Sequence, residues 1–254
     1  MKKNAIYIVF LTSVLALTGC SGKTNQSSNV EQTNSTSNQE VAVNKNIVNL
    51  SIGSIDELNE IVEKDITDTI DDLTKEHEQL QKDINTYDEY VNNVEKIEVF
   101  YNKVKKTHQD LCIRMREYSI KYAENIMALD ISNDDKYDEL DVIYDIVYDD
   151  YGDDIYDEVY DGFLDDMYDF YDHVIGDAYE DVAYKEWSKV RSQEYEWWSD
   201  TRSDVYEQWS DYRSDVYEFG SDLRGEIWSD DIDKAKKVIE DFKEDITMLK
   251  EKSE

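Results

Sequence analysis

Proline is absent from this chain of 254 residues, and only eight glycines occur in it. None of the glycines lies between Ser54 and Tyr151. Because proline and glycine disfavour a helix interior most, their scarcity predicts an all-α fold of long helices, arranged as an elongated bundle or coiled coil. Cysteine is scarce as well, with Cys20 and Cys112 alone, which argues against an internal disulfide framework.

Basic residues are few, since 27 Lys and Arg face 61 Asp and Glu. So negative a chain argues against a nucleic-acid partner and against a helix lying flat on an anionic membrane. High charge also accompanies disorder. Here, however, 20 Tyr, 5 Trp and 6 Phe are present, and the apolar residues recur at helical spacing. We therefore expect a folded chain.

The first residues carry an export signal. Two lysines precede an apolar stretch over 5–17, which is too short to span a bilayer. The Leu17-Thr18-Gly19-Cys20 that follows resembles the lipobox of bacterial lipoproteins. The resemblance implies removal of a signal peptide, residues 1–19, and lipidation of Cys20, which would anchor the chain at the extracytoplasmic face of the cell membrane. A plain cleaved signal is the alternative.

A tether is expected next. Residues 20–53 are rich in Ser, Asn, Thr and Gln, a composition typical of flexible linkers. Ser54 and Glu57 then have the spacing of a capping box, which predicts the start of the first helix.

Over 66–122 the apolar residues alternate between steps of four and three, the heptad pattern of a coiled coil, with one change of phase. The pattern predicts one helix over 54–130, and a turn at Asn92-Asn93 is the alternative. His77 and His108 fall on the apolar seam. Most such histidines are core residues, and a pH switch is the less common role.

Between Tyr137 and Tyr184 there are eighteen Asp or Glu and no Lys or Arg. Tyr-Asp pairs recur about every twelve residues, and apolar residues recur mostly every four. The segment 136–183 is expected to be helical, with an apolar face that wanders round the helix. A reversal at 131–135 would lay the basic stretch 96–121 antiparallel to this acidic segment, by charge complementarity.

An eleven-residue phrase repeats through 184–228. Counted from its tyrosine, position 4 holds Trp, position 8 Arg and position 11 Val or Ile. At about 98° per residue these positions form one stripe of an amphipathic helix suited to a right-handed supercoil. The residues that we expect to bind a partner are Tyr195, Tyr206, Tyr217, Trp187, Trp198, Trp209, Arg191, Arg202, Arg213 and Arg224.

The arginines lie inside the apolar stripe. Arg202 and Arg213 each have a Trp four residues before and a Tyr four residues after, which suits packing of a guanidinium on aromatic rings. One interpretation is that the stems cover aromatic surface while the heads reach water. The other is a ladder that selects an acidic partner, either the segment 136–183 or a foreign surface.

A heptad returns in 229–254, where we expect a last helix that packs back on the first. A heptad favours a left-handed supercoil and an eleven-residue repeat a right-handed one. The two cannot pair along their whole length without strain. We therefore expect a short hairpin, or a helix over 184–228 that associates with copies of itself.

Motifs of catalytic or metal chemistry are absent from the sequence. There is no EF-hand, no zinc ligand set, no nucleophile motif and no phosphate-binding loop. We expect no enzyme, no cofactor and no specific metal site. Weak, diffuse binding of Ca²⁺ or Mg²⁺ by the acidic segment stays open.

Three function classes follow. The first is a lipid-anchored extracytoplasmic lipoprotein whose helices bind a protein partner or form a homo-oligomer at the cell surface. The alternative is an acidic module for cations or cationic ligands. The third is an amphipathic lipid-binding protein of the kind built from eleven-residue repeats, as in apolipoproteins, although an acidic polar face is unsuited to anionic membranes.

Overall fold

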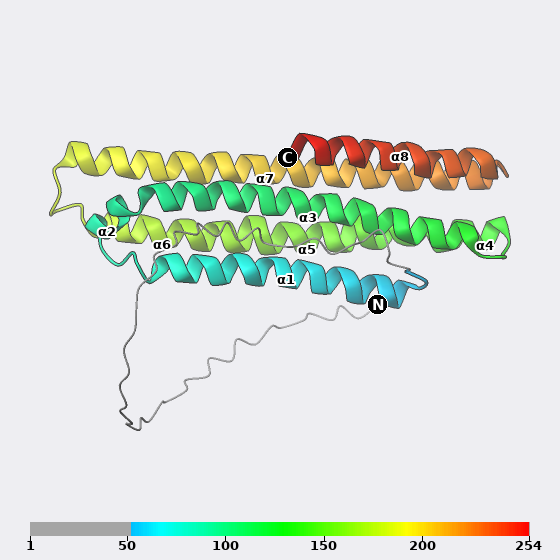
Figure 1. Cartoon of the computed structure of the whole chain (residues 1–254), viewed down its shortest axis with the longest axis horizontal. Helices are drawn as coiled ribbons and strands as arrows, with labels where there is room; N and C mark the ends of the chain where they lie inside the picture. Colours follow the sequence, from blue (N-terminus) through cyan, green and yellow to red (C-terminus); the bar gives the residue numbers. More distant parts are fainter. Residues whose placement is uncertain (1–51, 254) are drawn as a thin grey trace, which may run out of the picture. The chain divides into compact units, whose positions relative to one another are not determined.

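The computed structural model describes residues 52–253, and all regular structure in that range is helical, which confirms the predicted all-α class. The long helices α1 (Ile55–Gln81), α3 (Val94–Ala128) and α7 (Tyr184–Trp228) lie side by side (Figure 1). Within 52–253, no helix has an apolar stretch long enough to cross a membrane. The export signal, Cys20 and nearly all of the tether fall outside the described residues.

The predicted capping box begins α1. The backbone N–H of Glu57 donates to Ser54 Oγ at 3.3 Å. In return, Glu57 Oε2 accepts the backbone N–H of Gly53 at 2.7 Å. The prediction is confirmed, with the returning bond one residue earlier than in the usual motif.

The prediction of one continuous helix over 54–130 is wrong. A turn at 82–86 follows α1, and the short α2 (Tyr87–Asn92) is separated from α3 by a second interruption at Asn93. Ile84 is fully buried although it lies in the turn. The apolar spacing therefore runs through the reversal without marking it.

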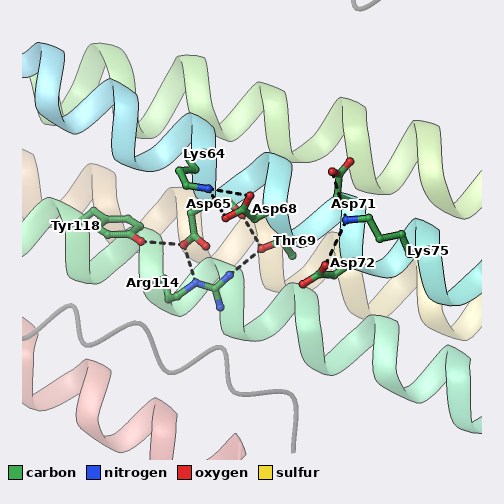
Figure 2. A network of polar contacts seen from close by, with 9 residues as sticks. All are labelled: Lys64, Asp65, Asp68, Thr69, Asp71, Asp72, Lys75, Arg114 and Tyr118. Atoms are coloured by element: carbon green, nitrogen blue, oxygen red, sulfur yellow. Dashed lines mark hydrogen bonds and ion pairs between the residues drawn. The ribbon is translucent and has the colours of Figure 1, made fainter. Parts of the chain in front are cut away.

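A buried polar network joins α1 to α3, as Figure 2 shows. Arg114 Nε donates to Asp65 Oδ2 at 2.7 Å, and Arg114 Nη2 donates to Thr69 Oγ1 at 3.0 Å. The Tyr118 hydroxyl donates to the same Asp65 oxygen at 2.9 Å. Only 9% of the Arg114 side chain and 1% of the Asp65 side chain are exposed, so the charges satisfy each other away from water.

The ion pairs that the basic residues of α3 make with other long helices are with α1 and α7, so the predicted pairing of 96–121 with the acidic segment is wrong. Lys105 Nζ lies 3.2 Å from Asp204 Oδ2, and Arg116 Nη2 lies 2.8 Å from Asp215 Oδ2. Asp204 and Asp215 therefore lie on the side of α7 that faces α3. The reversal after α3 does occur, but it places the acidic segment mainly against α7.

The acidic segment folds as one rod, which we call the acidic rod. Its consecutive helices are α4 (Asn133–Val142), the π segment η2 (Ile143–Asp150), α5 (Tyr151–Ile155), the π segment η3 (Tyr156–Phe163) and α6 (Leu164–Gly176). Buried side chains recur at every fourth position: Ile143, Val147, Tyr151, Ile155, Val159, Phe163, Met167, Tyr171 and Ile175.

The π segments keep that buried face straight. Four residues of α-helix turn through about 400°, so an apolar residue at every fourth position would drift by about 40° each time. A π-helix has more residues per turn, because its hydrogen bonds run from i to i+5. Two π segments therefore offset the drift, and the predicted wandering of the apolar face is wrong.

The last helix, α8 (Ile232–Ser253), packs on α7 and α3 instead of on the first helix. The rings of Phe219 and Phe242 stack there with centroids 4.4 Å apart. Because α7 packs along its length on α3, α8 and the acidic rod, the short hairpin expected from the mismatch of repeats does not form.

We predict that Arg114→Met lowers the free energy of unfolding by about 3–5 kcal/mol, because Asp65 stays buried without the charge that faces it. Urea unfolding measures the loss. The double variant Arg114→Met/Asp65→Leu should recover most of it, and Lys75→Met, on the exposed side of α1, should change stability by less than about 0.5 kcal/mol. A double variant as unstable as Arg114→Met would contradict this role of the network.

Candidate functional site

Four arginines of α7 reach carboxylates of the acidic rod in antiparallel order, and we call these contacts the arginine ladder. For Arg213, the Nη2–Asp149 Oδ1 distance is 3.0 Å and the Nη1–Asp153 Oδ1 distance is 3.3 Å. The pairs are Arg191 with Asp172, Arg202 with Asp161 and Asp165, Arg213 with Asp149 and Asp153, and Arg224 with Asp141. Of the two acidic partners considered for the ladder, the structure places the segment of the same chain against it.

Aromatic rings enclose the guanidinium groups. The Arg202 guanidinium carbon lies 4.1 Å from the ring centre of Tyr160 and 5.2 Å from that of Trp198. Arg213 repeats the arrangement at 4.3 Å from Tyr148 and 5.0 Å from Trp209. Each contact of this kind is worth about 0.5–2 kcal/mol, with the larger values where water is excluded. The heads of Arg202 and Arg213 are thus each held between two rings, whereas Arg191 and Arg224 each lie over one.

Two tryptophans of α7 also bind the backbone of the rod. Trp209 Nε1 donates to the carbonyl of Gly152 at 2.7 Å, and Trp187 Nε1 donates to the carbonyl of Ile175 at 2.8 Å. Gly152 matters for this close approach, because a Cβ there would lie 3.3 Å from the side chain of Arg213. The tryptophans therefore set the depth at which α7 sits against the rod.

The two sides of the ladder have different periods. The arginines are eleven residues apart, whereas Asp141, Asp153 and Asp165 are twelve apart. One π segment lies in each twelve-residue interval, and a π turn accommodates the extra residue. From Asp161, near the end of η3, to Asp172 in α6 the spacing is eleven, and most of that interval is α-helix. The π segments therefore hold the rod in register with α7.

The buried face of α7 differs from the predicted stripe in which positions of the repeat it includes. Position 11 is buried as expected, but position 7, with Thr201, Tyr212 and Leu223, is buried as well. The tyrosines of position 1 lie at the edge of the interface and remain about half exposed: Tyr195 55%, Tyr206 48% and Tyr217 46%. Their rings still contact tyrosines of the rod, for example Tyr217 with Tyr144 at 5.3 Å. We call Tyr195, Tyr206 and Tyr217, together with the tyrosines of the rod that they contact, the aromatic row.

One buried carboxylate in α7 was not predicted from the sequence. Glu194 occupies position 11, where the later copies hold Val205, Val216 and Ile227, and only 1% of it is exposed. The hydroxyls of Tyr90 and Tyr101 both donate to its carboxylate. Burial is the main cause that raises the Glu194 pKa to about 7. The charged residue at an apolar position of the repeat was the signal that could have identified it.

Both seam histidines are buried, and burial lowers the pKa of each to about 4. His77 lies among aromatic rings and stacks on Phe100 at 5.7 Å. His108 Nδ1 lies 2.8 Å from Gln208 Oε1. Burial also raises the pKa of the Cys112 thiol to about 12, so Cys112 is a small buried core residue and not a reactive thiol.

Within residues 52–253, no three or more His, Cys, Asp and Glu side chains are grouped so that they could hold a metal ion. Comparison with known proteins gives no further guide, because no family model, curated protein or solved structure matches the chain. The features that distinguish the site are therefore the arginine ladder and the aromatic row beside it.

We predict that Glu194→Gln reduces the pH dependence of stability. A carboxyl whose pKa is raised by folding stabilises the protein below its unfolded pKa, and this contribution is lost as the pH rises through the folded pKa. Relative to Glu194→Gln, the natural chain should lose about 3 kcal/mol between pH 4.5 and pH 8. Urea unfolding of both proteins across that range measures the difference.

Taking the difference between the two proteins is essential, because His77 and His108 have the opposite effect. Their lowered pKa values remove stability as the pH falls from about 6.5 towards 4. Both proteins share that loss, so it cancels. A constant difference between natural chain and variant from pH 4.5 to pH 8 would contradict the role assigned to Glu194.

Proposed function

We propose that this protein is a lipid-anchored extracytoplasmic lipoprotein that binds a protein partner at the cell surface through the aromatic row of α7. The row is the observation that carries the proposal. Tyrosine is enriched at protein interfaces, because its ring buries much area while its hydroxyl stays satisfied. Here equivalent tyrosines stand half exposed at every eleventh residue of one long helix.

The ladder supports this role by making the row rigid. A binding surface loses less free energy on association when its side chains are already ordered. The arginines are occupied by carboxylates of the same chain, so the partner is left with the tyrosines and the residues around them. The lipobox resemblance supports the proposed anchoring at the membrane, because the lipobox precedes a segment with the composition of a flexible tether.

The lipid-binding alternative is less well supported. The most apolar positions of the repeat, Val205, Val216 and Ile227, are buried within the chain. To offer them to a membrane, α7 would have to leave α3 and break the ladder. The alternative of a cationic ligand has a specific observation in its favour, the negative charge around the row.

The proposal can be tested on intact cells with a photoreactive group. We expect p-benzoylphenylalanine in place of Tyr206 to form a discrete cross-linked adduct in the membrane fraction. The same group in place of Glu240, an exposed residue of α8, is the matched control and should form none. Equal labelling from both positions, or none from either, would contradict a binding role for the row.

Cys20→Ser tests the lipid anchoring in the same cells. The natural chain should incorporate an alkyne-labelled fatty acid and sediment with membranes, and Cys20→Ser should lose both properties together with the Tyr206 adduct. Retention of the fatty-acid label by Cys20→Ser would contradict lipidation at this residue.

A further inference from the structure

The exposed side of α7 carries a groove that recurs along the helix. One groove has a volume of about 560 Å³ and is lined by Tyr148 of the rod together with Trp209, Ser210, Arg213, Ser214 and Tyr217. A second, of about 340 Å³, is lined by Tyr168 of the rod together with Trp187, Ser188, Arg191, Ser192 and Tyr195. The five α7 residues of the two grooves differ by 22 positions, which is two repeats. We call them the Tyr–Ser grooves.

The composition of the repeat explains the shape. Two serines separate consecutive tyrosines on the exposed side of α7, and their small side chains leave a hollow between the larger rings. The middle repeat has the same residues at the same positions: Trp198, Ser199, Arg202, Ser203 and Tyr206. The grooves are therefore a property of the repeat.

Charge selects the ligand. Around the larger groove, Arg213 is the one positive group, and Asp149 and Asp153 already bind it. Glu218 and Asp222 also line this groove. One positive and four negative groups give the larger groove a formal charge of −3, so it favours a cation over an anion. The smaller groove is lined by Arg191 as its one charged residue, and Asp172 binds that arginine.

We propose that the Tyr–Ser grooves bind lysine and arginine side chains of a cationic polypeptide segment. In the larger groove a cation would find an aromatic ring face, serine hydroxyls that accept hydrogen bonds, and the carboxylates of Glu218 and Asp222. The large negative charge of the chain would speed the encounter with such a partner. The inference rests on the proposed function and adds to it the chemistry of the partner.

The repeat also fixes a spacing. Equivalent positions are eleven residues apart, or about 16.5 Å along an α-helix. An extended chain covers that distance in about five residues. Basic side chains about five residues apart in the partner would therefore reach consecutive repeats. A second copy of this chain has the right period, but its face carries the same negative charge.

The test measures binding of fluorescein-labelled deca-lysine to the purified full chain at physiological salt, by fluorescence anisotropy. Any highly acidic protein binds such a peptide weakly, so the comparison needs two variants of equal net charge. The groove variant is Glu196→Gln/Glu207→Gln/Glu218→Gln: Glu218 lines the larger groove, and Glu196 and Glu207 are its exposed equivalents in the two preceding repeats. The control is Glu240→Gln/Glu244→Gln/Glu251→Gln on α8, whose residues are likewise exposed.

We expect the groove variant to weaken binding about tenfold or more and the control by less than about twofold. Tyr195→Ser/Tyr206→Ser/Tyr217→Ser leaves the charge unchanged and should also weaken binding about tenfold or more, with thermal unfolding as the check that it folds. Equal losses in the two glutamate variants, or unchanged binding by the tyrosine variant, would overturn the proposal.

Three further outcomes separate this inference from the proposed function. If deca-lysine does not bind while the Tyr206 adduct persists on cells, the row binds a partner that is not cationic, and only the inference fails. If that adduct has twice the mass of the chain, the occupant is a second copy, and the inference fails again. Loss of the adduct as well would remove the proposed function.

Discussion

The structure depends on one repeated contact, an arginine of α7 that lies over one or two aromatic rings and is bound to one or two aspartates of the acidic rod. Carboxylates alone would give little, since pairs with exposed aspartates are each worth about 0–1 kcal/mol. The rings exclude water from the guanidinium and make the contact stronger. Because the contact repeats along α7, its contributions add up. Each aspartate of the rod must also stay opposite its arginine, and a plain α-helix with a twelve-residue repeat could not maintain that register.

The same contact decides which surface is left exposed. Because the arginines, the tryptophans and positions 7 and 11 of the repeat face the rest of the chain over 195–224, the exposed residues of that range are tyrosine, serine, Asp and Glu. Basic residues of α3 are used inside the bundle as well, where Arg114 and Arg116 bind aspartates of α1 and α7. Negative charge therefore accumulates on the outer face, beside tyrosines that stand half exposed.

Much of this could be predicted from the sequence, and the failures have physical reasons. The repeat identified the ladder arginines, because an arginine inside an apolar stripe needs a carboxylate opposite. The turn at 82–86 was missed because Ile84 stays buried through it. The π segments were missed because a spacing of four was compared with an α-helix alone. Glu194 was missed because the repeat was examined for what its copies share, whereas Glu194 is where one copy differs.

A double-mutant cycle tests the ladder most directly, because it isolates the energy between two chosen residues. Urea unfolding of Arg202→Ala, Asp165→Ala and their double variant should give a coupling of about 1 kcal/mol. The matched cycle of Arg202 with Asp153, which binds the next arginine, should give a coupling near zero. The account predicts that only the first pair is coupled. Equal coupling in both cycles, or none in the first, would contradict the register on which the rest of the structure depends.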